Sequence, residues 1–377
     1  MSRIQSAEYG VMASHPHLAE VDGHPGPRLT GHLPALDALR GIAVLLVFLF
    51  HADMPGFSGA FIGVDIFFVL SGFLITVLLL QEHQNYGKIS LRHFYMRRLL
   101  RLMPALLLML VVFVAFCYWY FPNPIDQLRH LQDAFMVLFY AANWTRAFDL
   151  HRPAILGHGW SLSIEEQFYA LWPLMLILML RLHVFRRILA IAALLFISWG
   201  WRLCLLNQGA SWDRVYNGFG CRADMLLAGC LLASLWNAGY LSGWQRRFRF
   251  VALGGHWVAA LALGALIVTA NWQTPELYRW QYGIVAFAAS IVILELVNHP
   301  QAFMGKLLCR PSLIWTGRVS YGLYLWHYPI IYFLNSGSTS LSHGQRILIA
   351  ALLTLICVSL SWYFLEQPLL RMKKSFI

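Results

Sequence analysis

Apolar stretches long enough to cross a bilayer recur along almost the whole chain, and this pattern constrains the fold more than any other feature. A transmembrane helix needs about 20 predominantly apolar residues, with a range of roughly 17 to 25. The candidate stretches are 35–52, 60–81, 103–121, 160–181, 188–206, 219–236, 251–270, 280–298, 319–334 and 345–363. The sequence therefore predicts an all-α, polytopic transmembrane helical bundle of about ten spans.

The composition agrees with a membrane location. Hydrophobic residues make up 59% of the 377 residues and charged residues 12%, which is about half the charged fraction of an ordinary soluble domain. The net charge of +11 does not indicate nucleic-acid binding, because no basic domain stands apart from the apolar stretches. The six cysteines have neither metal-ligand nor disulfide-framework spacing, so we interpret them as core residues and expect no metal.

The basic residues predict the orientation of the spans. With the N-terminus placed in the cytoplasm, the cytoplasmic segments hold 19 Lys and Arg residues and the opposite segments hold six. Cytoplasmic loops carry the excess of Lys and Arg in membrane proteins, so both termini are predicted to be cytoplasmic. We expect a disordered cytoplasmic tail over 1–33, a transmembrane domain over 34–364 and a short basic cytoplasmic tail over 365–377.

Three ionisable residues share one face of the first predicted span. Arg40 and His51 are eleven positions apart, which on a helix is about three turns plus 20° and a rise of about 16 Å. Asp37 lies one turn before Arg40 on nearly the same stripe. Charge within hydrocarbon is costly, so such residues line a functional cavity or pair with one another. This face is therefore a candidate site.

Six motifs follow one another along the chain. They are R-x10-H (40–51), GVDIFFVLSGFLIT (63–76), FYMRRLLRLMP (94–104), WSLSIEEQFYALWP (160–173), RVSYGLYLWHYPI (318–330) and WYFLEQPLLR (362–371). Together they resemble the acyltransferase 3 family of membrane O-acyltransferases. The resemblance implies that the transmembrane domain moves an acyl group, most often acetyl, from cytoplasmic acyl-CoA to a hydroxyl of a cell-surface or exported glycan, or of a small secreted product. It also implies a multi-pass protein of the cell (inner) membrane.

One branch of this family carries a hydrolase-like extracellular domain after the last span, whereas this sequence ends at Ile377. We therefore expect the membrane domain to complete the transfer alone or to hand the acyl group to a partner. Two alternatives stay open: a transporter of a glycan or small metabolite, and an acyl-passing subunit that serves a separate periplasmic transferase. The motifs carry no signal for the oligomeric state, the acceptor or the acyl chain length.

Transfer to an alcohol requires a base for the hydroxyl proton. We expect His51, near the outer end of the first span, to be that base or to carry the acyl group transiently. Arg40, on the cytoplasmic side, is expected to act in catalysis by binding acyl-CoA, while Asp37 orients its guanidinium; a fixed ion pair is the alternative. Asp65 in the second span needs a partner, and we expect it to orient His51, with pairing to another span as the alternative.

Three arginines precede the third predicted span. Arg98 and Arg101 are three positions apart and share a helical face, with Arg97 beside them. Cytoplasmic arginines next to a span commonly anchor it at lipid phosphates. The resemblance favours binding of the CoA phosphates, for which a planar bidentate donor is suited.

Acidic and aromatic residues open the fourth predicted span. Glu165 and Glu166 either stabilise the N-terminal end of the helix by their negative charge, or one of them contacts the acceptor. Adjacent helical residues point about 100° apart, so at most one of the two is expected to face a cavity with ease. Trp160 is a candidate for stacking on a sugar, with an interfacial aromatic belt as the alternative.

Two further groups are candidates. Residues of the ninth span form a dense patch: Arg318, Tyr321, Tyr324, Trp326 and His327. His327 lies about half a turn off the face of Arg318, which separates this patch from the first pair, and His327 is the reserve candidate for the base. Arg222 and Asp224, at the start of the sixth span, either line the acceptor entrance or form a structural pair.

Overall fold

The computed structural model of the chain describes residues 27–29, 31–241, 249–336 and 340–372. These residues form helices and their connections without a β-strand among them, which confirms the all-α prediction. Each of the ten expected stretches coincides with a helix, and seven helical stretches of the described part are long and apolar enough to cross a membrane. The predicted tail over 1–33 lies mostly outside the described residues, whereas part of the predicted C-terminal tail is helical.

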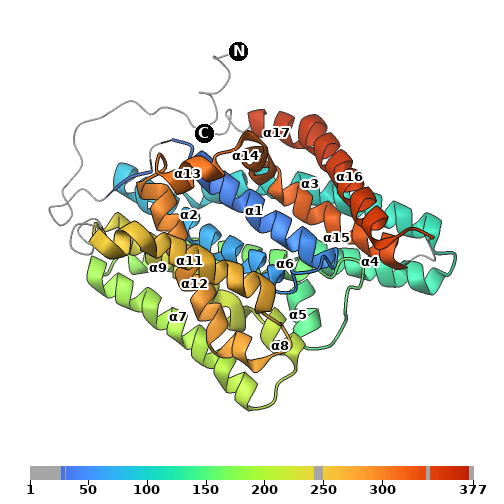
Figure 1. Cartoon of the computed structure of the whole chain (residues 1–377), viewed down its shortest axis with the longest axis horizontal. Helices are drawn as coiled ribbons and strands as arrows, with labels where there is room; N and C mark the ends of the chain where they lie inside the picture. Colours follow the sequence, from blue (N-terminus) through green and yellow to red (C-terminus); the bar gives the residue numbers. More distant parts are fainter. Residues whose placement is uncertain (1–26, 30, 242–248, 337–339, 373–377) are drawn as a thin grey trace.

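The longer helices of the bundle are α1 (Pro34–His51), α2 (Gly63–Tyr86), α3 (Leu91–Tyr120), α4 (Pro124–Leu138), α6 (Gly159–Met179), α7 (Val184–Asn207), α9 (Phe219–Asn237), α11 (Arg249–Thr269), α12 (Tyr282–Asn298), α15 (Ser320–Ser336) and α16 (His343–Ser361). The short helices α5 (Ala142–Ala147), α8 (Trp212–Asn217), α13 (Phe303–Leu308) and α14 (Pro311–Arg318) lie in the connections, and α17 (Gln367–Met372) follows α16. Figure 1 shows α1 crossing the middle of the bundle beside α15, with α7 along one edge and α16 at the other.

Local sequence sets several helix ends. Gly87 ends α2 in a left-handed conformation, with φ 69°, which a residue without Cβ adopts without strain. Ser90 begins α3 by accepting a hydrogen bond from the His93 backbone N–H. Ser342 and Gln345 form a capping box at the start of α16. The helix α3 thus begins twelve positions before the predicted span at 103, and its first turns carry the arginine cluster.

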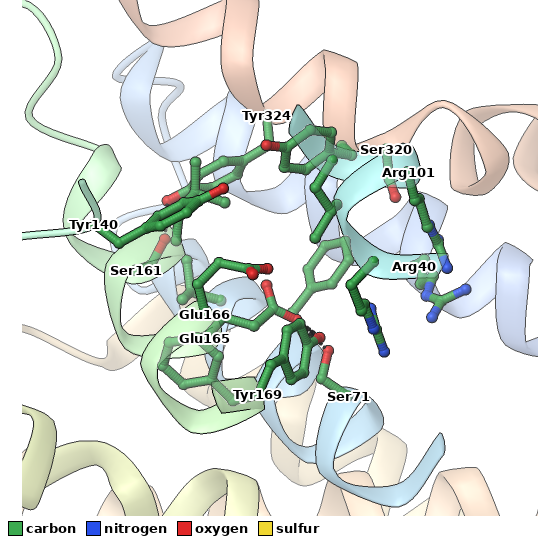
Figure 2. Close-up of a pocket in the computed structure, with 17 residues that line it drawn as sticks. Arg40, Ser71, Arg101, Tyr140, Ser161, Glu165, Glu166, Tyr169, Ser320 and Tyr324 are labelled. Atoms are coloured by element: carbon green, nitrogen blue, oxygen red, sulfur yellow. Dashed lines mark hydrogen bonds between the residues drawn. The ribbon is translucent and has the colours of Figure 1, made fainter. Parts of the chain in front are cut away.

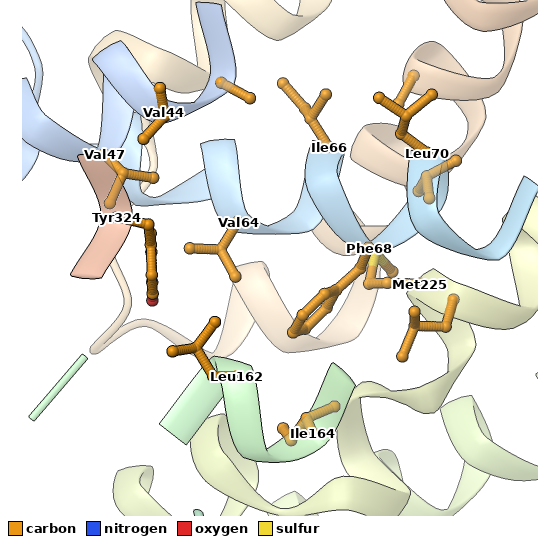
Figure 3. Close-up of a cluster of buried hydrophobic side chains, with 14 of the residues drawn as sticks. Val44, Val47, Val64, Ile66, Phe68, Leu70, Leu162, Ile164, Met225 and Tyr324 are labelled. Carbon is orange, nitrogen blue, oxygen red and sulfur yellow. The ribbon is translucent and has the colours of Figure 1, made fainter. Parts of the chain in front are cut away.

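The centre of the bundle is the buried helix α2, which packs along α9. A Cβ on Gly72 of α2 would lie 1.9 Å from the Leu226 carbonyl oxygen, and one on Gly229 of α9 would lie 2.0 Å from the Val69 carbonyl oxygen. Small residues permit this close approach of two backbones, as in membrane helix pairs. Figure 3 shows the apolar side chains that α1, α2, α6 and α9 contribute around this centre.

Large apolar side chains also lie on the outside of the bundle. Phe196 and Ile197 of α7 are 62% and 65% exposed, and Leu261 of α11 is 73% exposed. Soluble monomers rarely expose contiguous apolar surfaces of this kind, whereas lipid covers them in a membrane. The helix lengths, the apolar periphery and the composition together indicate a multi-pass membrane protein.

Candidate functional site

An open cavity, whose empty space of about 710 Å³ includes solvent outside it, lies among α1, α2, α3, α6 and α15. Its polar lining residues are Arg40, Ser71, Arg98, Arg101, Tyr140, Ser161, Glu165, Glu166, Tyr169, Ser320, Tyr321 and Tyr324. Figure 2 shows Arg40 and Arg101 on one side of this cavity and Tyr140 and Ser161 on the opposite side, with both glutamates between them. The cavity therefore combines a basic side with an acidic and hydroxyl-rich interior.

The basic side brings together two motifs that are distant in sequence. Arg40 comes from the second turn of α1, and Arg98 and Arg101 come from α3. Arg98 and Arg101 both line the cavity, as their shared helical face predicted. Arg97 does not line it; its Nη2 lies 3.3 Å from the Glu82 carboxylate. The cluster thus divides into two arginines at the cavity and one in an ion pair.

Asp37 holds the guanidinium of Arg40 from one turn earlier on α1. The distance from Arg40 Nη1 to Asp37 Oδ1 is 3.4 Å. The Asp37 carboxylate also contacts His32, and its Oδ2 lies 3.7 Å from Arg318 Nε. Arg40 therefore takes part in an ion pair and lines the cavity at the same time.

Both glutamates of α6 line the cavity, so the expectation that at most one would face it is wrong. Residues of α1, α2, α3 and α15 complete the lining, so side chains that point about 100° apart on α6 both reach the cavity. Glu165 accepts a hydrogen bond of 2.5 Å from the Ser71 hydroxyl and another from the Tyr169 hydroxyl. The guanidinium of Arg98 lies 4.1 Å from the centre of the Tyr169 ring, within range of a cation–π interaction.

Tyr140 reaches the cavity from the connection after α4, where no periodic signal marks it. Its backbone has φ 53°, an uncommon conformation for a residue other than glycine. The Gln167 side chain of α6 donates a hydrogen bond of 2.7 Å to the Tyr140 carbonyl and so holds this turn. Burial, and next the Glu166 carboxylate, raise the pKa of the Tyr140 hydroxyl, which therefore stays protonated and able to donate a hydrogen bond.

Two hydroxyl groups of the cavity lining contact each other. The hydroxyls of Ser161 and Tyr324 are 2.5 Å apart, and Tyr324 also donates a hydrogen bond of 2.9 Å to the His158 carbonyl. The Tyr324 ring centre lies 5.4 Å from that of His327 and 5.3 Å from that of His158. Tyr324 thus joins the cavity to a group of histidines that does not itself line it.

His51 and His327 form a hydrogen-bonded pair. Nδ1 of His51, at the end of α1, lies 3.0 Å from Nε2 of His327 in α15. The separation of the two predicted patches was therefore wrong, because helical angles along one segment do not report where a second helix packs. His327 is 1% exposed, whereas His51 is half-buried. His51 is therefore the more accessible member of the pair.

Asp65 does not orient His51, in contrast to the expectation. Its Oδ1 lies 2.5 Å from Arg222 Nη2, and both side chains are fully buried between α2 and α9. A second buried pair joins Arg202 of α7 to Asp224 over 2.7 Å. Pairing of Asp65 with another span is the alternative that the sequence left open, whereas Arg222 and Asp224 pair with Asp65 and Arg202 and not with each other.

Trp160 lies beside the buried pair of Arg222 and Asp65 and is not among the residues that line the cavity. Its ring centre is 5.5 Å from the Arg222 guanidinium, which also lies 4.1 Å from the Tyr282 ring centre. Aromatic faces of this kind stabilise a buried cation. Trp160 therefore contacts an internal arginine where the sequence suggested a sugar.

Sequence reasoning missed Tyr140, Ser161 and His158. Ser161 carries a usable signal, because it precedes Glu165 by four positions and so shares its helical face. His158 comes one residue before α6, and Tyr140 lies in a connection. No helical periodicity extends to such positions, so only the tertiary structure could place them.

Fold and site define a class: a membrane helical bundle with a basic cavity that leads through hydroxyl groups to a histidine pair. The sequence profile of the acyltransferase 3 family, an acyltransferase domain, matches residues 33–366. The chain therefore belongs to the acyltransferase 3 family, as its motifs indicated.

Several curated proteins are similar to this chain over most of its length. The peptidoglycan O-acetyltransferase OatA of Listeria monocytogenes is 34% identical over 350 residues, which cover 90% of this chain and 56% of that protein. The O-acetyltransferase OatA of Staphylococcus aureus is 36% identical, covering 92% and 58%. The putative peptidoglycan O-acetyltransferase YrhL of Bacillus subtilis is 35% identical, covering 90% and 55%. The chain thus spans a little over half the length of these relatives. No solved structure matches it.

Proposed function

We propose that this protein is an integral membrane O-acetyltransferase that moves an acetyl group from cytoplasmic acetyl-CoA to a hydroxyl of a peptidoglycan-type or other exported glycan. The observation that carries the proposal is the cavity with Arg40, Arg98 and Arg101 at its basic side, connected through Tyr324 to the histidine pair. Family membership and the names of the similar proteins support acyl transfer and a glycan acceptor.

The basic side suits a donor with phosphates. Arginine presents planar, bidentate donors that match phosphate oxygens, and three arginines line the cavity. Beside Ser71, α2 contributes the apolar lining residues Val64, Phe67 and Phe68, which suit the uncharged arm that carries a thioester. Arg40, Arg98 and Arg101 are assigned to CoA binding, while Arg97 with its Glu82 partner is not.

The proposed topology has ten spans, with both termini in the cytoplasm. The proposed location is the inner membrane, or the single membrane of a cell that has only one. The topology is supported by the ten helices that coincide with the apolar stretches and by the excess of Lys and Arg on the assigned cytoplasmic side. In this orientation the arginines at the cavity lie toward the cytoplasm and His51 lies toward the outer surface. The donor and acceptor then approach the site from opposite sides.

His51 is the proposed base for the acceptor hydroxyl, and Glu165 and Glu166 are the proposed groups that bind polar atoms of the substrates within the cavity. Removal of a general base typically lowers the rate by about 10²- to 10⁴-fold. Asp65 is assigned to holding α2 against α9 through Arg222, and Trp160 to covering that guanidinium.

The test supplies acetyl-labelled acetyl-CoA to membranes that contain the wild-type chain or His51→Ala, and follows the label into glycan. The wild type is expected to consume the thioester and label glycan, and His51→Ala to do neither, with an unchanged amount of protein in the membrane. Equal labelling by both chains would remove His51 from the mechanism. Export of glycan without thioester consumption would identify a transporter instead, and thioester consumption that needs a separate soluble protein would identify an acyl-passing subunit.

A further inference from the structure

The two histidines of the pair are held in a chain of hydrogen bonds that ends on a backbone carbonyl. Nδ1 of His327 lies 3.0 Å from the Leu323 carbonyl oxygen, one turn earlier on α15. Nε2 of the same ring lies 3.0 Å from Nδ1 of His51. Both nitrogens of His327 are therefore engaged, and the ring is 1% exposed, so His327 has no nitrogen left with which to take a proton from a substrate.

This chain of contacts fixes where the protons lie in the neutral pair. A carbonyl oxygen only accepts, so Nδ1 of His327 must carry the proton that it shares with Leu323. In a neutral imidazole the other nitrogen is then an acceptor, and Nδ1 of His51 must donate to it. The lone pair of His51 is left on Nε2.

We propose that His327 is a positioning residue that holds His51 in the tautomer with its proton on Nδ1 and its basic lone pair on Nε2. The inference rests on the proposed function of His51 as the base. The hydrogen bond made by one ring nitrogen sets the state of the other, and this detail decides which atom reacts. His327, which the sequence analysis gave as the reserve candidate for the base, is thus the partner of His51.

The surroundings keep His327 from turning. Its ring centre lies 6.3 Å from Phe48, 5.4 Å from Tyr324 and 5.6 Å from His158, so rings from α1, α15 and the start of α6 surround it. The His51 ring meets Tyr328 edge-on at 4.7 Å between centres. A ring packed in this way presents Nε2 in one direction, as an orienting partner must.

The proton balance of the transfer follows from this tautomer. As the acceptor oxygen forms its bond to the acyl carbonyl carbon, its proton passes to Nε2 of His51. The resulting imidazolium keeps its Nδ1–H bonded to His327, whose acceptor nitrogen stabilises the added charge. When the bond between the carbonyl carbon and the CoA sulfur breaks, the proton on Nε2 leaves for the thiolate. His327 stays neutral throughout and never exchanges a proton with a substrate.

The position of the proton is measured directly by nitrogen-15 NMR of the histidine-labelled full chain in lipid bilayers. The signals of the pair are assigned by their loss in His51→Gln and in His327→Gln. A protonated Nδ1 and an unprotonated Nε2 at His51 are expected at neutral pH. A proton on Nε2 of His51 would overturn the proposal, whatever the activity of the protein.

Kinetics then test whether the contact matters for the reaction. His327→Leu removes the acceptor and is expected to lower kcat on the order of 10-fold or more while leaving KM for acetyl-CoA unchanged. His327→Gln offers an amide oxygen to His51 and an amide N–H to Leu323, and should recover most of the loss. The exposed His343 supplies the control, because His343→Leu should change neither parameter.

The outcomes separate the two claims. Equal losses in His327→Leu and His327→Gln, with both variants inserted and folded, would overturn the positioning role. Full activity of His51→Ala would overturn the proposed function, even with the expected tautomer observed. Loss of activity in His51→Ala together with recovery in His327→Gln supports both.

Discussion

Two regions of the bundle place arginines against carboxylates, and they differ in how completely the charges are closed off. At the contact of α2 and α9, Arg222 and Asp65 are fully buried and lie 2.5 Å apart. At the cavity, Arg40 is partly exposed and lies 3.4 Å from Asp37, and Arg98 stacks on Tyr169 beside two glutamates. The charges of the first region are closed off from solvent, whereas those of the second line an open cavity.

This difference teaches that the role of an arginine within a membrane protein depends both on its ion-pair partner and on its exposure to a cavity. The sequence marked Asp65 and Arg40 alike, as ionisable residues inside apolar stretches. A buried pair with one member removed leaves an unpaired charge in a low dielectric, so its variants should affect stability. An accessible arginine at a cavity should affect binding instead. Three variants test this contrast.

The largest effect is expected for Asp65→Ala. Removing one partner of a buried pair costs about 3–5 kcal/mol, because the Arg222 charge is left buried among aromatic rings. Thermal unfolding of the protein in detergent should show a large drop in the midpoint. The double variant Asp65→Ala with Arg222→Met should recover much of this loss. An unchanged midpoint for the single variant would contradict the structural assignment of the pair.

A smaller loss is expected for Gly72→Ala at the same contact of α2 and α9. The added Cβ would lie 1.9 Å from the Leu226 carbonyl oxygen, so the two helices must move apart. Overpacking of this kind typically costs about 1–3 kcal/mol. Gly200→Ala in α7 is the control, because its Cβ meets no atom within 4 Å. Equal unfolding midpoints for the two variants would mean that α2 and α9 are not in close contact.

The smallest change in free energy is expected at the cavity, and in binding alone. Arg98→Gln should weaken acetyl-CoA binding about tenfold, equivalent to about 1.4 kcal/mol, with an unchanged unfolding midpoint. Arg97→Gln is the matched control from the next position, and it should leave the affinity within about twofold, since charge-assisted contacts act only where they touch the ligand. Titration calorimetry on both variants decides the point. Equal affinities would reduce the arginines to membrane anchors.

Much of the fold followed from the sequence. The hydropathy pattern located ten helices, because a segment in hydrocarbon must be apolar and must satisfy its own backbone hydrogen bonds. The shared face of Arg98 and Arg101 was also correct, since helical geometry relates residues within one segment. The same geometry failed for Glu165 and Glu166, because the curvature of a cavity around α6 is not a property of α6.

By itself, the sequence determined the helical class, the family and the individual residues that carry charge into the bundle. Only the tertiary structure decided which of them meet: Asp65 with Arg222, Arg97 with Glu82, and His51 with His327. The physical reason is that these pairs join helices separated by as many as 276 positions, and their contacts depend on how whole helices pack. A charged residue in an apolar segment indicates that a partner is needed, and the packing of the helices determines which residue that partner is.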